Sequence, residues 1–142
     1  MDNEFSKPIK RLTYKNLDVW KQARSLAISV YKVCDKDPLR RSWGLCDQMQ
    51  RAAISIPSNI AEGDERGTNK DALRFLFISK GSLAELRTQL DIAHATEKIT
   101  GFEYEELECA SGHVERLLGG MIRRRLEREK PGHHTDTPSS PA

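Results

Sequence analysis

Two clusters of Lys and Arg side chains are the residues best suited to do chemistry in this 142-residue chain. The first holds four basic residues and no acidic residue between positions 7 and 15. In the second, between positions 116 and 130, six basic residues outnumber the two acidic ones, Glu127 and Glu129. Guanidinium and ammonium groups bind phosphate through charge and hydrogen bonds, so such clusters can hold the backbone of a nucleic acid. The candidate binding residues are Lys7, Lys10, Arg11, Lys15, Arg116, Arg123, Arg124, Arg125 and Arg128.

The second basic cluster also has a plainer interpretation. Basic side chains near the C-terminal end of a helix complement the helix dipole and keep the surface soluble. The net charge of +2 does not separate the two readings, because it is small and unevenly distributed. The sequence shows no row of aromatic residues for stacking on single-stranded bases, so nucleic-acid binding would rest on phosphate contacts. Both interpretations stay open at this level.

Other chemistry finds no support in residue type and spacing. None of the nine glycines forms a phosphate-binding G-x-G-x-x-G or G-x-x-x-x-G-K loop. His94 and His113 fall on different predicted helices, and His133 and His134 fall in the predicted tail, so the four histidines are better explained as solvated or structural residues than as metal ligands. No Ser or Cys is spaced with a base and an orienting group as a nucleophile would be. We therefore expect no enzyme, no catalytic residues, no metal centre and no cofactor.

Cysteine usage and hydropathy indicate a cytoplasmic protein that has no membrane contact. Cys34, Cys46 and Cys109 are an odd number without C-x-x-C spacing, and each lies where a small buried hydrophobic residue would fit a helix. Such thiols are typical of a reducing compartment. No apolar run approaches the roughly 20 residues of a membrane span, and the polar N-terminus does not resemble a secretory signal.

Four helices must position the basic residues. Apolar residues recur at steps of three and four within four stretches, which predict helices from about 16 to 37, from 42 to 63, from 69 to 93 and from 101 to 126. Asn16 is the expected N-cap of the first helix, while Thr68 and Thr100 are expected to cap the third and fourth. Short connections favour an all-α, up-and-down antiparallel four-helix bundle over residues 16–130. Residues 1–15 would be a flexible basic arm and residues 131–142 a disordered tail.

Two features predict irregular packing within this bundle. Pro57 lies inside the second helix, where its missing N–H and its ring predict a kink or a break. Gly81 and Ser82 interrupt the large side chains of the third helix, which predicts a close approach of another helix at that level.

A polar stripe follows one side of the second helix. Its members are Arg51, Ser55, Ser58, Asn59, Glu62 and Arg66. A solvated face, a ligand site and a face packed on other protein are all compatible with the spacing. Short Ser and Asn side chains favour a packed or assembled face, in which Arg51 and Glu62, together with Glu85 of the third helix, would satisfy one another.

The same stretch carries a family resemblance. Residues 48–63, QMQRAAISIPSNIAEG, resemble the signature of the four-helix-bundle family named for proteins encoded in intervening sequences of bacterial 23S ribosomal RNA genes. Residues 17–23, LDVWKQA, resemble the family's first helix. Residues 74–76 and 81–86, RFL and GSLAEL, resemble its third helix. The resemblance extends over roughly residues 17 to 126.

This resemblance implies an up-and-down bundle that assembles into a homopentameric ring without catalytic activity. Relatives in the family include accessory proteins of diversity-generating retroelements, which bind a reverse transcriptase and nucleic acid. The positions 40–43, RRSW, and the tail after Lys130 depart from the family pattern. On this reading the residues that serve packing or assembly are Arg51, Ser55, Pro57, Asn59, Glu62, Gly63, Gly81, Ser82 and Glu85.

Two functions are therefore expected. In the first, a ring repeats the basic clusters and holds RNA or DNA electrostatically. In the alternative, the protein is a scaffold or adaptor that presents the segment 40–43 or its outer helix faces to a protein partner and has no direct nucleic-acid role. Trp43 distinguishes them, because exposure of its side chain in the assembled ring would favour a partner surface, whereas burial would remove that argument.

Overall fold

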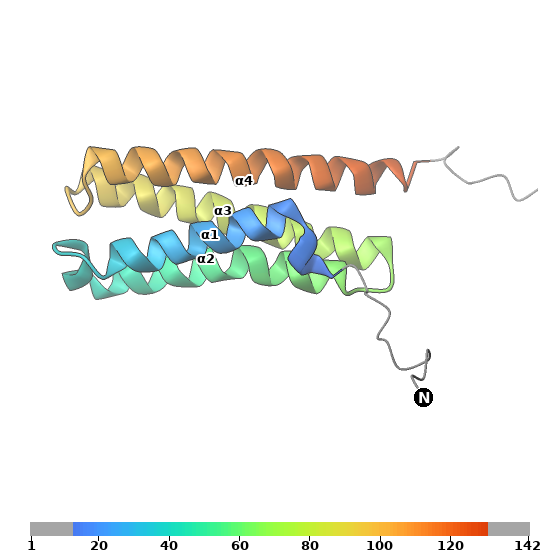
Figure 1. The fold of residues 1–142 in the computed structure, drawn as a ribbon, viewed down its shortest axis with the longest axis horizontal. Coiled ribbons are helices and arrows are strands. Elements are labelled where there is room, and N and C mark those ends of the chain that lie inside the picture. The colour runs from blue at the N-terminus through green and yellow to red at the C-terminus, as the bar shows by residue number, and fades with distance from the viewer. Residues whose placement is uncertain (1–12, 131–142) are drawn as a thin grey trace, which may run out of the picture.

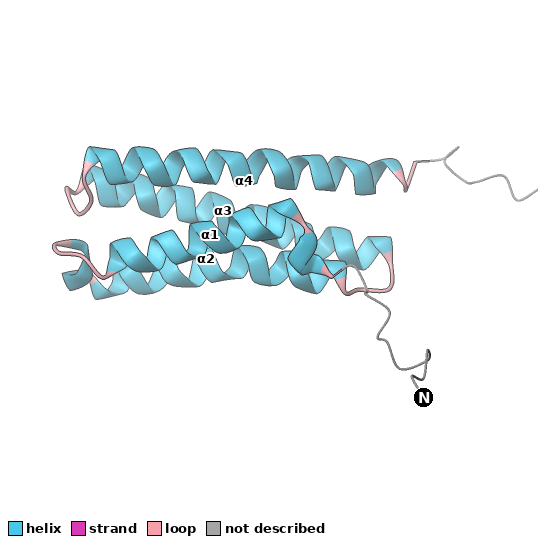
Figure 2. Cartoon of the chain, viewed as in Figure 1, coloured by secondary structure: helices cyan, strands magenta, loops and turns pink. Residues whose placement is uncertain are grey.

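The computed structural model describes residues 13–130, and over this range the chain is entirely helical outside its short connections. A 3-10 turn at Tyr14–Asn16 precedes α1 (Asp18–Cys34), α2 (Trp43–Asp64), α3 (Asn69–Ala95) and α4 (Gly101–Glu127). The four helices lie lengthwise against one another (Figure 1), and the described residues contain no strand (Figure 2). Each helix packs on the next, and α4 returns to α1. The predicted all-α four-helix bundle is confirmed.

Local capping explains where the last two helices begin. The Thr100 hydroxyl accepts the backbone N–H of Glu103 at 3.0 Å, and the Glu103 carboxylate accepts the backbone N–H of Thr100 at 2.9 Å. Thr68 accepts the backbone N–H of Asp71 at 3.2 Å at the start of α3. These caps satisfy N–H groups that have no partner within the helix. Both predicted caps are confirmed.

The start of α1 differs from the prediction. Asn16 is not its N-cap, because Asn16 closes the preceding 3-10 turn by donating its backbone N–H to Thr13 O at 3.0 Å. Leu17 occupies the cap position and makes no side-chain cap hydrogen bond. The side chain of Leu17 packs against the core instead. Burial of this apolar residue, which sequence-based capping rules do not weigh, fixes the boundary.

The apolar stripes of the sequence meet in one core. All seven stripe residues predicted for α3 are buried. In the other helices most stripe residues are buried as well, whereas Trp20, Leu45, Ala110 and Leu117 are half-buried at the margin. Leu126 is 42% exposed, since α4 extends beyond the core there. The α3 stripe consists of Ala72, Leu76, Ser79, Leu83, Leu86, Leu90 and Ala93.

Pro57 does not break α2. The helix continues from Trp43 to Asp64 with Pro57 inside it. Ala53, Ile56 and Ile60 around it are fully buried, so packing against α1 and α3 holds the helix where one backbone hydrogen bond is missing. The Ser79 hydroxyl adds a cross-helix bond by donating to Ile56 O at 2.9 Å. Of the two predicted outcomes the break is therefore wrong, while the kink stays a prediction.

The close approach of α2 and α3 occurs at Gly63 rather than at Gly81. A Cβ at Gly63 would lie 3.1 Å from the carbonyl oxygen of Ala72 and 3.2 Å from the Cβ of Phe75. A Cβ at Gly81 would meet nothing within 4 Å, because Gly81 lies on the outer face of α3. Of the two residues predicted to mark a close approach, Ser82 is buried against α2 and contacts Ser55, whereas Gly81 takes no part in that contact.

Candidate nucleic-acid interface

The C-terminal half of α4 presents its arginines to two grooves. Arg116 and Arg123 lie seven residues apart, which places them on one side of the helix about two turns from each other. They line a groove of about 440 Å³ between α3 and α4, together with Lys80 of α3. The remaining lining residues are Leu83, Glu115, Leu118 and Gly119. The structure therefore brings Lys80 next to two residues predicted from the sequence.

The second groove lies beside the first turn of α1. Arg124, Arg125 and Arg128 line it, opposite Asp18 and Asp64. Its volume is about 450 Å³. The two carboxylates offset part of the positive charge, so this groove is electrostatically more balanced than the groove between α3 and α4. Lys15 is exposed in the turn just before α1.

Arg125 is partly a structural residue. Its Nη1 donates to Asn69 Oδ1 at 3.3 Å, and Asn69 Nδ2 donates to the backbone oxygen of Arg125 at 2.9 Å. Burial lowers the pKa of Arg125, and the nearby charge of Arg128 lowers it further, while Asp64 acts in the opposite direction. The contact with Asn69 ties the end of α4 to the start of α3.

Charge pairing separates these arginines from several others of the bundle, although Arg24 and Arg74 also form no ion pair within residues 13–130. Elsewhere, Arg40, Arg51 and Arg66 pair with carboxylates on their own helix or turn, and Arg87 pairs across α3 and α4 with Glu108 and Glu115. Among the residues that the structure describes, no carboxylate lies within ion-pair distance of the α4 arginines. This unpaired set comprises Arg116, Arg123, Arg124, Arg125 and Arg128.

Three of the predicted motif residues meet between α2 and α3. The Ser82 hydroxyl donates to Ser55 Oγ at 2.8 Å, and Asn59 Nδ2 donates to Ser55 Oγ at 2.9 Å and to Ser55 O at 2.8 Å. Arg51, Gln48, Glu85 and Gln89 line the shallow groove outside this contact. The short polar side chains thus serve helix packing within the subunit.

The predicted network of Arg51, Glu62 and Glu85 does not form. Arg51 pairs with Asp47 at 3.0 Å within α2, and Glu62 pairs with Arg66 just beyond the end of α2; each partner is four residues away. Pairs at this spacing are neighbours on one helix, so they compete successfully with partners across the bundle. Glu85 is exposed on α3. The interpretation of these three side chains as one mutually satisfied group is wrong.

Other reactive groups do not gather into a site. Within residues 13–130, no group of three His, Cys, Asp or Glu side chains is placed to hold a metal ion. Burial raises the pKa of the Cys34 thiol to about 12, aided by the hydrogen bond and charge of Cys46. A thiol held in its protonated form is a poor nucleophile. No α-helix in the described part of the chain is both long and apolar enough to cross a bilayer.

The candidate residues taken from the sequence did not include Lys80 and Arg87, and most of the predicted arm, residues 1–15, lies outside the part of the chain that the structure describes. Lys80 and Arg87 are seven residues apart on α3, and this helical spacing was the signal in the sequence that they share a face. Lys7, Lys10 and Arg11 lie outside the described residues. So do the remainder of the predicted arm and the predicted tail, apart from positions 13–15.

The opposite end of the bundle carries exposed aromatic residues. Trp43 begins α2 and is 82% exposed, and Phe102, in the first turn of α4, is 74% exposed. The connections between α1 and α2 and between α3 and α4 lie at this end (Figure 1). Exposed aromatic side chains are enriched where proteins bind partners.

Comparisons with known proteins agree with this architecture. A solved structure from Bacteroides thetaiotaomicron, described as a protein with unknown function from the S23 ribosomal protein family, is similar with a TM-score of 0.69 and 24% identity. The similarity covers 74% of this chain and 98% of that chain, and at this identity it supports the fold. No curated protein matches the chain. Residues 15–120 match the family described as 23S rRNA-intervening sequence protein, as the signature in α2 predicted, and the chain therefore belongs to this family.

Proposed function

We propose that this protein is a non-enzymatic cytoplasmic bundle protein that binds the phosphate backbone of RNA or DNA through the arginines of α4. The observation that carries the proposal is the absence of carboxylate partners, among the described residues, for five arginines on one half-helix. Its three free cysteines support a reducing compartment. Lys15, in the turn before α1, adds a base on the side of the bundle where α4 ends.

Unpaired like charges on one surface repel one another. Two unit charges about 4 Å apart interact by about 1 kcal/mol in water and by about 4 kcal/mol near a protein surface. A bound polyanion removes this repulsion and releases condensed counterions, which supplies a sequence-independent driving force. The carboxylates that neutralise Arg40, Arg51 and Arg66 make those residues weaker candidates for the same role.

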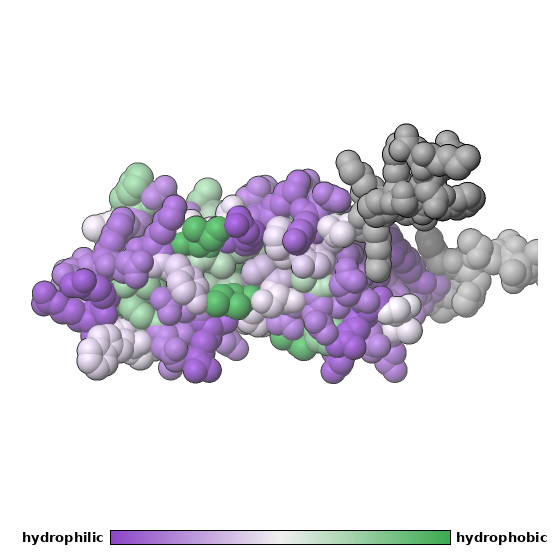
Figure 3. All heavy atoms as spheres, turned by 60° about the horizontal axis from the view of Figure 1, so that its bottom comes forward, coloured by the Kyte–Doolittle hydropathy of each residue, from purple (hydrophilic) through white to green (hydrophobic). Residues whose placement is uncertain are grey.

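A ring of identical subunits would strengthen such binding, and we propose a homopentamer, as the family resemblance implies. The face formed by α1 and α2 supports assembly: it is mostly hydrophilic but interrupted by hydrophobic residues (Figure 3). Ile28, Tyr31 and Ile54 are exposed along a groove of about 320 Å³ that Pro57 also lines. Apolar residues grouped on an outer face are typical of a subunit contact. Light scattering on the purified protein would give the subunit number.

The test is the binding of a short labelled RNA and a DNA duplex at two salt concentrations. Replacing Arg123, Arg124 and Arg128 with Ala should weaken binding and reduce its salt dependence, by about 0.9 in the log–log slope for each duplex phosphate that is no longer neutralised. The matched control replaces Arg40 and Arg41 at the opposite end of the bundle, where both pair with Asp37. Equal affinity and salt dependence for the α4 variant and the unaltered protein would refute the proposal.

A second candidate function is that of a scaffold for a protein partner, favoured by the 82% exposure of Trp43. Replacing Trp20 with Phe leaves Trp43 as the sole tryptophan of the chain, which contains two. Red-shifted emission that acrylamide quenches fully in the assembled protein would support a free partner surface. Blue-shifted, protected emission would place Trp43 in a subunit contact and remove this argument.

A further inference from the structure

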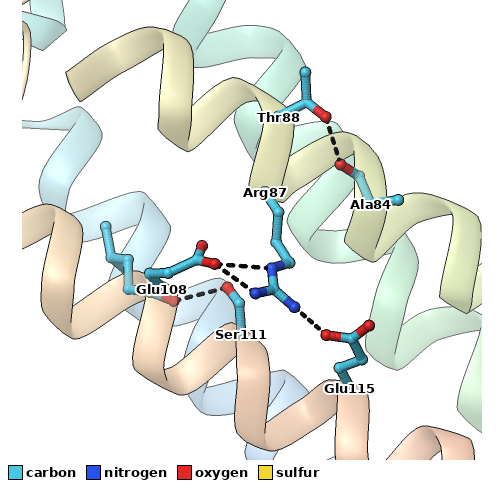
Figure 4. A network of polar contacts seen from close by, with 7 residues as sticks. Ala84, Arg87, Thr88, Glu108, Ser111 and Glu115 are labelled. Atoms are coloured by element: carbon cyan, nitrogen blue, oxygen red, sulfur yellow. Dashed lines mark hydrogen bonds and ion pairs between the residues drawn. The ribbon is translucent and has the colours of Figure 1, made fainter. Parts of the chain in front are cut away.

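The groove between α3 and α4 differs from the other grooves in how its one acidic residue is held. Lys80, Arg116 and Arg123 line the groove together with Glu115. The Glu115 carboxylate is engaged by Arg87 Nη1, while Arg87 Nε donates to Glu108 Oε1 at 3.1 Å. Figure 4 shows Arg87 reaching from α3 between the two glutamates of α4. Glu115, which lines the groove with the three cations, is thus neutralised by a fourth cation, Arg87.

The floor of the groove is formed by apolar side chains and bare backbone. Leu83 and Leu118 are buried beneath it, and Gly119 contributes no side chain. Within 4 Å, a Cβ at Gly119 would meet only Arg123 Nη1, at 3.6 Å. Packing between helices therefore does not require this glycine, and the guanidinium of Arg123 lies back over the exposed backbone. Arg116 makes the same contact with Gly112, where its Nη1 would lie 3.8 Å from a Cβ.

The cations of the groove have few competing partners. Arg116 Nη2 lies within hydrogen-bond distance of His113 Nδ1, at 3.4 Å, and forms no ion pair with a described carboxylate. Lys80 and Arg123 form no ion pair with any residue between positions 13 and 130. By contrast, Asp18 and Asp64 face Arg124, Arg125 and Arg128 across the other basic groove. Three cations that line one groove without a free carboxylate beside them are suited to phosphate groups.

We propose that the groove between α3 and α4 seats successive phosphates of the nucleic-acid backbone on Lys80, Arg116 and Arg123, and that Arg87 keeps the groove open to anions by holding Glu115. This inference rests on the proposed function and assigns it to one of the two basic grooves. Arg87 acts as a positioning residue, since its own guanidinium is occupied by the two glutamates. Loss of Arg87 leaves Glu115 free to take the place of a phosphate.

The first experiment measures the affinity of a short labelled single-stranded RNA for the full chain as a function of salt. For a single strand, each phosphate that is no longer neutralised makes the slope of log affinity against log salt concentration shallower by about 0.7. When salt is raised fourfold, the loss of affinity is therefore about 2.6-fold smaller for each such phosphate. The Lys80→Ala variant should show this change. For Lys80→Ala with Arg116→Ala and Arg123→Ala, the change should be about 18-fold over the same range. The comparison variant, Arg124→Ala with Arg128→Ala, alters only the other groove.

The second experiment tests the role of Arg87 by rescue. Arg87→Met should weaken RNA binding because Glu115 is released beside the three cations. Adding Glu115→Gln should restore binding, whereas adding Glu108→Gln should not, because Glu108 does not line the groove. Light scattering and circular dichroism would show that each variant keeps its assembly and helix content. A merely structural role of Arg87 would give the same result with either glutamine.

The outcomes separate the two proposals. If the Arg124→Ala with Arg128→Ala variant loses binding and the Lys80 variants do not, RNA binds through the other groove, and the inference is overturned while the proposed function stands. If the unaltered chain binds neither RNA nor the DNA duplex at any salt concentration, the proposed function itself fails. Weaker binding by the Lys80 variants together with rescue by Glu115→Gln alone supports the inference.

Discussion

Two glycine-to-alanine substitutions should change stability in opposite directions. Gly63 and Gly81 are both helical and are equivalent in sequence terms, but a Cβ at Gly63 would lie 3.1 Å from Ala72 O and 3.2 Å from Phe75 Cβ. At Gly81 the same atom meets nothing within 4 Å. We expect Gly81→Ala to stabilise the protein and Gly63→Ala to destabilise it.

The magnitudes follow from two opposing effects. Alanine is favoured over glycine inside a helix by about 1 kcal/mol, and this gain applies at both positions. At Gly63 the added methyl group presses on a backbone carbonyl and on the base of a side chain, neither of which can move freely, and such overpacking costs about 1–3 kcal/mol. The free energy of unfolding of Gly63→Ala should therefore range from equal to that of the unaltered protein to about 2 kcal/mol lower. It should be about 1–3 kcal/mol lower than that of Gly81→Ala.

Urea unfolding followed by circular dichroism measures both variants, with light scattering to detect any change in assembly. The free energies of unfolding are compared at equal protein concentration, because the proposed assembly would contribute to stability. If Gly63→Ala proves as stable as Gly81→Ala, the close approach of α2 and α3 at Gly63 does not exist in solution. The packing argument would then be refuted.

Three further results are expected. Ser55→Ala should cost about 1–3 kcal/mol in urea unfolding, because the buried Ser82 hydroxyl loses its acceptor; an unchanged midpoint would show that another acceptor replaces it. The backbone hydrogen bond of the α4 cap lowers the pKa of Glu103, so its stabilisation is present above the ordinary pKa of about 4.3 and is lost as pH falls through the lower folded-state pKa. The stability difference between the unaltered protein and Glu103→Gln should accordingly disappear in acid, and a difference independent of pH would contradict this. A thiol-specific reagent at neutral pH should modify exposed Cys109 quickly and Cys34, whose pKa is about 12, slowly; equal rates would contradict the burial of Cys34.

Sequence reasoning succeeded where a local pattern has one physical outcome. The repeat of apolar residues from Ala72 to Ala93 required a helix with one buried side, and all seven positions are buried. Thr100 and Glu103 satisfy each other over three residues, so their capping box needs no information from the rest of the chain. The arginine cluster on α4 was likewise visible, because its members lie within a few turns of one helix.

The predictions that failed concern residues whose role depends on which neighbour the side chain contacts in the folded bundle. Gly81 and Gly63 look alike in the sequence, but only the packing of α3 on α2 determines which one faces a backbone carbonyl. Arg51 could have paired with Glu62 or Glu85, and it pairs with Asp47 because a partner four residues away costs less conformational entropy than one across the bundle.

The sequence by itself thus determined four helices, the caps of the last two, the buried stripes and a surplus of basic residues on the last helix, because these follow from periodicity and from contacts within a few residues. Only the tertiary structure placed Lys80 beside Arg116 and Arg123 and paired Glu115 with Arg87. The physical reason is that neighbouring helices lie about 8–10 Å apart, so the rotation of α3 against α4 determines which charges meet.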